Sequence, residues 1–201
     1  MVRAILDCRK TQTRRVIKPD WSRCLDLDDP ADRSQAVAGC PQGKRGDRLW
    51  VRETWGCKEA DHPLVPDGRK PRPGDSIVYR ANPGDAWQWR GRPGDPGMGD
   101  FVWRPSIYMP RWASRIDLEV TAVRVERLQA ITEDDARWEG VGHVLGDDHP
   151  EVSRLLTAAD LVQTDRRVAA FAWLWDNLNA KRRYPWASNP WVWVVEFRRV
   201  R

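Results

Sequence analysis

The 201-residue chain contains few metal-binding side chains, and their spacing matches no metal motif. It has four cysteines and three histidines, which are Cys8, Cys24, Cys40, Cys57, His62, His143 and His149. The cysteines form no CxxC pair, and the histidines form no HExxH pattern. These absences argue against a zinc finger and a zinc deaminase, and Cys57 with His62 alone is too small a set to predict a metal site. We therefore expect no metal and no cofactor.

Glycine-rich phosphate motifs and long apolar runs are also missing. The chain has no GxGxxG segment and no P-loop, which argues against a nucleotide cofactor held by a glycine-rich turn. No nucleophile elbow supports a Ser-His-Asp triad. Because no signal peptide or membrane-length apolar stretch is present, the sequence predicts a cytoplasmic protein with free thiols and no membrane partner.

What the chain does have is charge and tryptophan. Lysine and arginine total 34 against 29 acidic residues, a net charge of +5 that permits a nucleotide or nucleic-acid partner without requiring one. Several of the 13 tryptophans lie beside arginine, which suits stacking on bases and cation-π contact. We expect more than half of them to belong instead to the core and rim of a barrel.

Hydrophobic periodicity predicts an α+β fold in a single domain, residues 1–201. The expected helices are residues 2–7, 133–139 and 155–178, and the expected strands are residues 48–55, 76–81, 116–128 and 191–200. Loop insertions rich in Pro, Gly and Asp are expected at about residues 19–45, 56–75 and 82–102. This order predicts a small mixed β-barrel with flanking helices and long loop insertions.

The basic segment at residues 8–15 (CRKTQTRR) carries most of the functional inference. Alternation in an extended backbone puts Lys10, Gln12 and Arg14 on one face and Thr11, Thr13 and Arg15 on the other. Lys10 and Thr13 therefore meet only if the chain bends between a short helix and the strand that follows. An uncharged lysine beside a threonine hydroxyl is a base and nucleophile pair. Lysine has an ordinary pKa of about 10.4, and we expect burial and the charges of flanking arginines to lower it. The alternative is a solvated basic turn that contacts phosphate or nothing.

Other candidates lie far along the chain. Thr132 is expected to cap a helix that ends at Glu139 and is closed by Gly140. The helix dipole disfavours an anion at this end, which suits Glu139 to donating a proton. Residues 103–115 interleave aromatic, basic and small side chains, which is typical of a pocket-lining segment and equally of a tethered loop packed on a barrel. The candidate substrate-binding residues are Arg15, Trp50, Arg52, Glu53, Tyr79 and Trp112.

Together, six segments resemble the ASCH-domain family, and more narrowly its phage and prophage branch. The segments are residues 9–15 (RKTQTRR), 46–55 (GDRLWVRETW), 109–115 (MPRWASR), 119–121 (EVT), 133–140 (EDDARWEG) and 189–197 (NPWVWVVEF). They are spread over nearly the whole chain. The resemblance implies a PUA-like fold, a small β-barrel flanked by helices, with a cleft associated with RNA or nucleotides.

Within that family, the small bacterial N(4)-acetylcytidine amidohydrolases carry a Gly-Arg-Lys-Thr-x-Thr-x-Arg motif and a glutamate from a later helix. The resemblance places the catalytic residues on Lys10, Thr13 and Glu139, and the motif arginine on Arg15. Cys8 stands where the motif has glycine, and the chain is about twice as long as the small amidohydrolases. The implied function is hydrolysis of an N(4)-acylated cytosine nucleoside or nucleotide.

Two alternatives belong to other functional classes. The same basic cleft and its tryptophans suit a non-catalytic RNA-binding module, which would bind RNA in a salt-dependent way without changing it. A ribonuclease is the third hypothesis, since other ASCH proteins are described as nucleases or as RNA-binding modulators.

Overall fold

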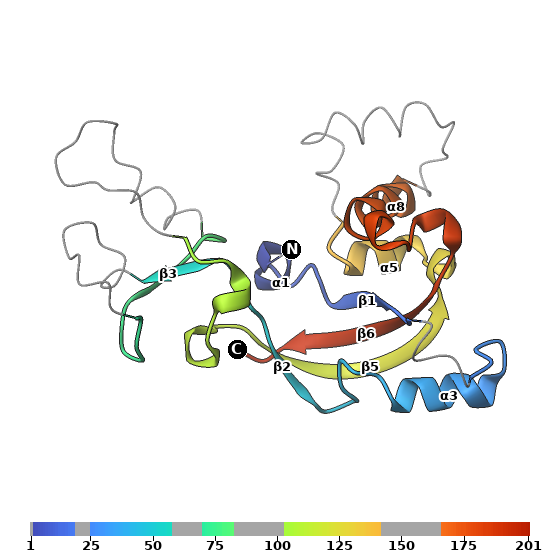
Figure 1. Ribbon diagram of the computed structural model, residues 1–201, viewed down its shortest axis with the longest axis horizontal. Coiled ribbons are helices and arrows are strands. Elements are labelled where there is room, and N and C mark those ends of the chain that lie inside the picture. The colour runs from blue at the N-terminus through green and yellow to red at the C-terminus, as the bar shows by residue number, and fades with distance from the viewer. Residues whose placement is uncertain (1, 19–24, 58–69, 83–102, 142–165) are drawn as a thin grey trace. The chain divides into compact units, whose positions relative to one another are not determined.

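The structure is a computed structural model that describes residues 2–18, 25–57, 70–82, 103–141 and 166–201 (Figure 1). Two compact units make up the chain. The first unit comprises Arg3–Arg48 and Glu119–Arg199, and the second comprises Leu49–Leu118 with the last two residues. We describe each unit by itself, and the single-domain expectation stays a prediction.

A curled antiparallel sheet forms the centre of the first unit. Its strands, in spatial order, are β1 (Gln12–Val16), β6 (Trp191–Arg199), β5 (Asp117–Arg127) and β2 (Arg48–Trp50), and the last two contribute residues to both units. Strand β1 pairs with β6 in the register Gln12↔Glu196 to Val16↔Val192. Residues 192–195 are all buried, as expected for a strand inside a sheet that is covered on both faces. The predicted strands 116–128 and 191–200 are confirmed.

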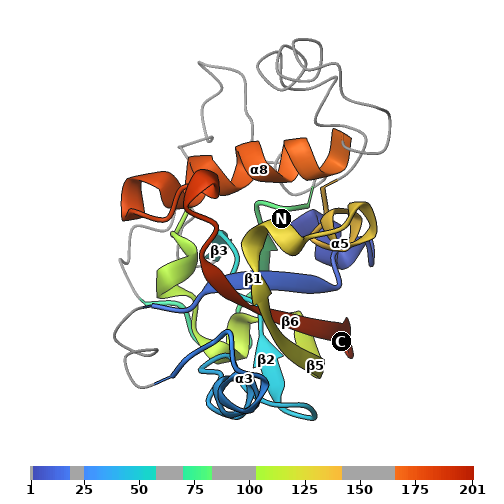
Figure 2. The ribbon, with the colours of Figure 1, turned by 90° about the vertical axis from the view of Figure 1, so that its right-hand side faces the viewer.

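Helices α5 (Glu133–Trp138) and α8 (Arg166–Asn179) lie on one face of this sheet (Figures 1 and 2). Thr132 caps α5 by accepting a hydrogen bond from the Asp135 backbone N–H, and the Asp135 carboxylate accepts one from the Thr132 backbone N–H. Phe171 and Trp175 of α8 pack with buried β6 valines to form the core. Both predicted helices are confirmed in type, but the start of the second lies outside the described residues.

The predicted loop at 19–45 is wrong at residues 30–38, because α3 (Pro30–Ala38) is a helix. Its start signals are present: Asp29 accepts a hydrogen bond from the Ala31 N–H, Pro30 occupies the first turn, and Gly39 follows the last residue. The helix has no apolar stripe, since Ala36 is its only buried residue. It is fixed to the sheet by the Trp193 indole N–H, which donates to the Ala36 carbonyl at 3.0 Å.

The second unit is built on a short hairpin, β3 (Trp55–Cys57) with β4 (Ile77–Tyr79). Strand β4 confirms the predicted strand 76–81. The predicted strand 48–55 is wrong in extent, because β2 ends at Trp50 and Trp55 begins β3. The break coincides with buried Glu53, whose carboxylate needs the Arg115 guanidinium at 2.9 Å as a partner.

These elements make a mixed α+β protein with a curled antiparallel sheet and few helices. The predicted insertions at 56–75 and 82–102 lie mostly outside the described residues. Over the part of the chain that the structure describes, no helix has the length and apolar character needed to cross a membrane.

Candidate active site

Lys10 and Glu139, 129 residues apart in sequence, form a buried pair in the first unit. The Lys10 ammonium donates to Glu139 Oε2 at 2.7 Å and to the Glu139 backbone carbonyl at 2.8 Å. Their side chains are only 4% and 5% exposed. Backbone contacts hold the same two segments together, because the Thr11 N–H donates to the Trp138 carbonyl at 2.8 Å. The structure therefore joins two of the three predicted catalytic residues.

The turn before Lys10 is set by helix α1 (Val2–Leu6), as the sequence predicted. The backbone N–H groups of Arg9 and Lys10 both donate to the Ala4 carbonyl at 2.8 Å. Cys8 has a φ of 56°, in the left-handed region that favours glycine. Cys8 stands where the motif has glycine, and it adopts the tight turn at a cost of about 1–3 kcal/mol of local strain.

Gly140 lets the end of α5 approach Lys10 closely. Its φ is +85°, and a Cβ added there would lie 3.0 Å from Lys10 Cβ and 3.1 Å from Ala4 Cβ. Both neighbouring atoms are Cβ atoms, whose positions are fixed by the backbone, so a rotamer change cannot relieve either contact.

We expect Gly140→Ala to lower the free energy of unfolding by about 1–3 kcal/mol, through the unfavourable φ and the displaced Lys10 stem. Urea unfolding of both proteins measures the difference. The matched control is Gly46→Ala, whose glycine has a φ of +92° with nothing within 4 Å of the added Cβ, so it carries only the backbone cost. Equal losses in the two variants would show that the close approach to Lys10 is unimportant.

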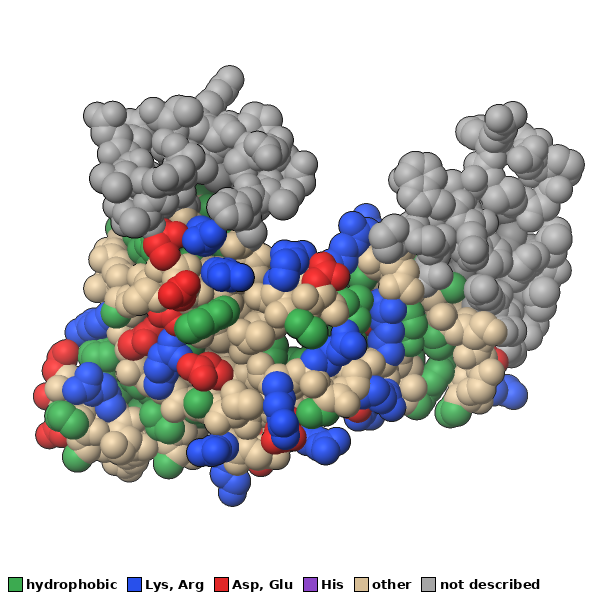
Figure 3. Space-filling model, turned by 180° about the vertical axis from the view of Figure 1, so that it is seen from behind, with side chains coloured by type: hydrophobic (Ala, Val, Ile, Leu, Met, Phe, Trp, Pro, Cys, Tyr) green, Lys and Arg blue, Asp and Glu red, His purple; other side chains and the backbone are tan. Residues whose placement is uncertain are grey.

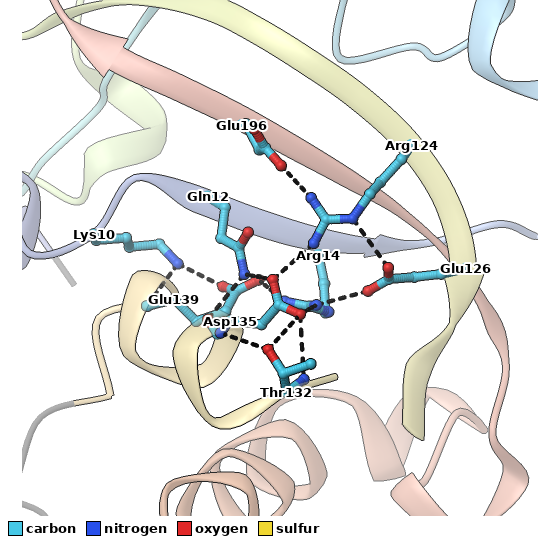
Figure 4. A network of polar contacts seen from close by, with 9 residues as sticks. All are labelled: Lys10, Gln12, Arg14, Arg124, Glu126, Thr132, Asp135, Glu139 and Glu196. Atoms are coloured by element: carbon cyan, nitrogen blue, oxygen red, sulfur yellow. Dashed lines mark hydrogen bonds and ion pairs between the residues drawn. The ribbon is translucent and has the colours of Figure 1, made fainter. Parts of the chain in front are cut away.

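Strand β1 alternates as predicted, with Lys10, Gln12 and Arg14 buried on one side. The Arg14 guanidinium has no exposed surface and contacts Glu126 at 2.6 Å, Asp135 at 3.3 Å and Glu139 at 3.2 Å (Figure 4). Three carboxylates from β5 and α5 thereby converge on a single buried cation. Arg14 fixes the position of Glu139 from the side opposite Lys10.

Arg124 and Gln12 complete this polar network. Arg124 contacts Asp135 at 2.7 Å and Glu126 at 3.0 Å, and also pairs with Glu196. The Gln12 side-chain amide donates to the Asp135 carbonyl and carboxylate. Burial acts to raise the pKa of Asp135, but the Thr132 backbone N–H, Gln12 and the two arginines together hold this pKa below its ordinary value. The carboxylate at the start of α5 is therefore kept charged.

Burial also determines the charge state available to Lys10. It lowers the pKa of Lys10, Glu139 acts in the opposite direction, and the charges of Arg15 and Arg14 add to the lowering. The net effect is a pKa below the ordinary lysine value, in the direction that the sequence predicted, with burial as the largest cause. An amine placed in this way loses its proton more readily than an exposed lysine.

The pair lies at the edge of a cavity of about 540 Å³. One wall comes from β1 and the residues next to it, and the other from α8 and the turn after it. The lining residues are Lys10, Thr13, Arg14, Arg15, Val16, Lys18, Gln42, Glu139, Phe171, Leu174, Trp175, Leu178, Asn179, Arg182 and Tyr184. All of them belong to the first unit.

Thr13 lines the same cavity as Lys10 and Glu139, so all three predicted catalytic residues border one space. Thr13 is half-buried, and in the described part of the chain its hydroxyl has no hydrogen bond to Lys10 or Glu139. Arg15 lines the cavity as an exposed side chain. The catalytic roles of these residues stay predictions.

The other predicted substrate-binding residues belong to the second unit and do not line this cavity. They are Trp50, Arg52, Glu53, Tyr79 and Trp112. Arg52 stacks 4.7 Å from the centre of the Trp50 ring, and Arg115 lies 4.0 Å from the Tyr79 ring while it pairs with Glu53. Both contacts are cation-π contacts. The role of the five predicted residues in substrate binding also stays a prediction.

Sequence reasoning missed the helical wall of the cavity, which includes Leu174, Leu178, Asn179, Arg182 and Tyr184. The amphipathic pattern of this helix was visible, but it was interpreted as core packing alone. Arg182 and Tyr184 follow directly after the last apolar turn, but no pattern in the sequence distinguishes a helix that lines a cavity from one that packs in the core.

Within the described ranges, no group of three or more His, Cys, Asp or Glu side chains is arranged to hold a metal ion. Comparison of the chain with family models, with curated proteins and with solved structures found no match. The chemistry of the cavity therefore has to be argued from its own residues.

Proposed function

We propose that the protein is an amidohydrolase that removes the acyl group from an N(4)-acylated cytosine nucleoside or nucleotide. The observation that carries this proposal is the buried Lys10–Glu139 pair on a cavity that Thr13 also lines. The sequence resemblance supplies the substrate, and we extend it to the fold, proposing that the curled sheet and its helices are a PUA-like domain of the ASCH type.

Each of the three side chains has a role in the proposed reaction. Lys10 takes the proton from the Thr13 hydroxyl, whose oxygen attacks the acyl carbonyl carbon. As the bond from that carbon to the cytosine N4 breaks, Glu139 delivers a proton to the departing amine. Water then hydrolyses the threonine ester, which releases the carboxylic acid and restores Thr13. Arg15 or a backbone N–H stabilises the oxyanion.

The 2.7 Å hydrogen bond between Lys10 and Glu139 provides a path for the proton. Along this path, the proton that Lys10 takes from Thr13 passes to Glu139, which delivers it to the departing amine. Burial lowers the pKa of Lys10, which favours the uncharged amine that the reaction needs.

The cavity also suits the size and character of a cytosine nucleoside. Its volume of about 540 Å³ lies within the range of roughly 300–1,000 Å³ that small-molecule sites occupy. Leu174, Leu178 and Tyr184 provide apolar surface for the base, and the Asn179 side chain supplies a polar group for its edge.

The proposal is tested by incubating the protein with N(4)-acetylcytidine and separating the products by chromatography. We expect cytidine and acetate in equal amounts, and at least a hundredfold slower release from Glu139→Gln, because general acid catalysis typically contributes about 10²–10⁴-fold. RNA binding without any product would contradict the proposal and favour the non-catalytic alternative, for which Tyr108 and Trp112, both exposed on the second unit, are candidate stacking residues. Cleavage of labelled RNA would favour a ribonuclease.

A further inference from the structure

The cavity carries more positive charge than its catalytic pair uses. Five of its lining residues are cations and one, Glu139, is an anion. Two of the cations are already neutralised, since Lys10 pairs with Glu139 and Arg14 with Glu126. The remaining three are Arg15, Lys18 and Arg182.

These three side chains are exposed, and among the described residues none of them has an ion pair or a side-chain hydrogen bond. Arg15 and Lys18 come from β1 and the residues after it, whereas Arg182 comes from η4 (Ala180–Arg182), the turn after α8. Opposite walls of one cavity thus present unpaired cations. An anion that enters the cavity therefore meets cations on both walls.

We propose that Arg15, Lys18 and Arg182 form an anion subsite at the exposed rim of the cavity that binds the phosphate of a cytosine mononucleotide, which leaves a backbone N–H to stabilise the oxyanion of the proposed reaction. The preferred substrate is then an N(4)-acylated nucleoside monophosphate rather than the free nucleoside. This inference rests on the proposed function for the identity of the base. The anion subsite itself depends only on the cavity and its charges.

The charges drawn toward the left of Figure 3 favour a small phosphate ligand over a long polyanion. There, below the grey atoms at the upper left, the described lysine and arginine side chains are interspersed with acidic ones. An RNA track requires a continuous basic stripe along many phosphates. Two arginines and a lysine around one cavity are instead suited to a single phosphate group, with forked donors from each guanidinium.

Calorimetric titration with cytidine 5′-monophosphate and with cytidine tests the subsite without relying on catalysis. We expect the monophosphate to bind at least tenfold more tightly, because charge-assisted hydrogen bonds to phosphate are the stronger kind. In the double variant Lys18→Gln/Arg182→Gln this preference is expected to fall to about twofold or less. The matched control is Arg45→Gln, which removes an exposed arginine of the same unit that does not line the cavity.

The kinetic counterpart is the ratio of kcat/KM for N(4)-acetylcytidine 5′-monophosphate to that for N(4)-acetylcytidine. We expect a ratio of about ten or more, which arises from a lower KM for the monophosphate. In the double variant this ratio is expected to fall towards one. Equal binding of nucleoside and monophosphate, or an equal loss in Arg45→Gln, overturns the subsite.

Two further outcomes separate the claims. Preferential monophosphate binding without deacylation supports the subsite and rejects the amidohydrolase. A short cytidine-containing RNA that binds far more tightly than the monophosphate, with a steep dependence on salt, overturns the assignment of a single phosphate.

Discussion

Lys10→Arg is expected to reduce deacylation of N(4)-acetylcytidine by about 10²–10⁴-fold, the contribution typical of a general base. The guanidinium keeps a positive charge opposite Glu139, so the buried pair is retained. It does not release its proton at any accessible pH, and it therefore cannot activate Thr13. Steady-state kinetics measure the change, and thermal unfolding checks that the variant is folded.

A second variant controls for the larger side chain of arginine. The double change Lys10→Met/Glu139→Gln removes both charges together, so that no unpaired charge is left in the buried site. It is expected to be folded and inactive. If Lys10→Arg retains wild-type turnover, Lys10 only holds β1 and α5 together, and its proposed role as the base is wrong.

The pH profile gives the same claim an independent readout. Lys10 has to lose its proton before it can act as the base, so kcat/KM is expected to rise with pH through the pKa of Lys10. Burial lowers the pKa of Lys10, and Glu139 only partly offsets this. The rise is therefore expected below the ordinary lysine value of about 10.4. The measurement is kcat/KM across the stable pH range.

Arg14→Met is expected to destabilise the protein by about 3–5 kcal/mol, the range for breaking a buried ion pair. Methionine fills similar space, but it leaves the carboxylates of Glu126, Asp135 and Glu139 without the cation that they share. Arg124 still neutralises the first two in part, whereas Glu139 keeps only Lys10. Urea unfolding at neutral pH measures the loss.

Arg198→Met is the matched control. Arg198 pairs with Glu119 at 3.0 Å, but its side chain is 66% exposed, so the same substitution is expected to cost less than about 1 kcal/mol. Similar losses in the two variants would show that burial of the Arg14 network adds nothing to stability. Adding Glu126→Gln to Arg14→Met should recover part of the loss, since one uncompensated carboxylate is then removed.

The sequence predicted the parts of the site that depend on local patterns. Period-two alternation placed Lys10, Gln12 and Arg14 on one side of β1, and the capping residue Thr132 located α5 with Glu139 at its end. Each of these inferences needs only neighbouring residues. They sufficed to predict which side chains share a face and where the helix ends, but not which face is buried.

The Arg14 network was beyond the reach of such patterns. Arg14 and Glu126 are 112 residues apart, and only the pairing of β1 with β6 and the position of β5 bring them together. Helix α3 was missed for a different reason: its capping signals are present in the sequence, but it is fixed through the Ala36 carbonyl rather than through an apolar stripe, so hydrophobic periodicity gave no signal for it.

The most direct test of the account compares Thr13→Val with Thr13→Ser in one assay of cytidine release from N(4)-acetylcytidine. Valine matches threonine in shape and suits the β1 strand, but it has no hydroxyl, whereas serine keeps the hydroxyl and loses a methyl group. The account predicts cytidine from the wild type and from Thr13→Ser, and none above background from Thr13→Val. Wild-type turnover by Thr13→Val would contradict it.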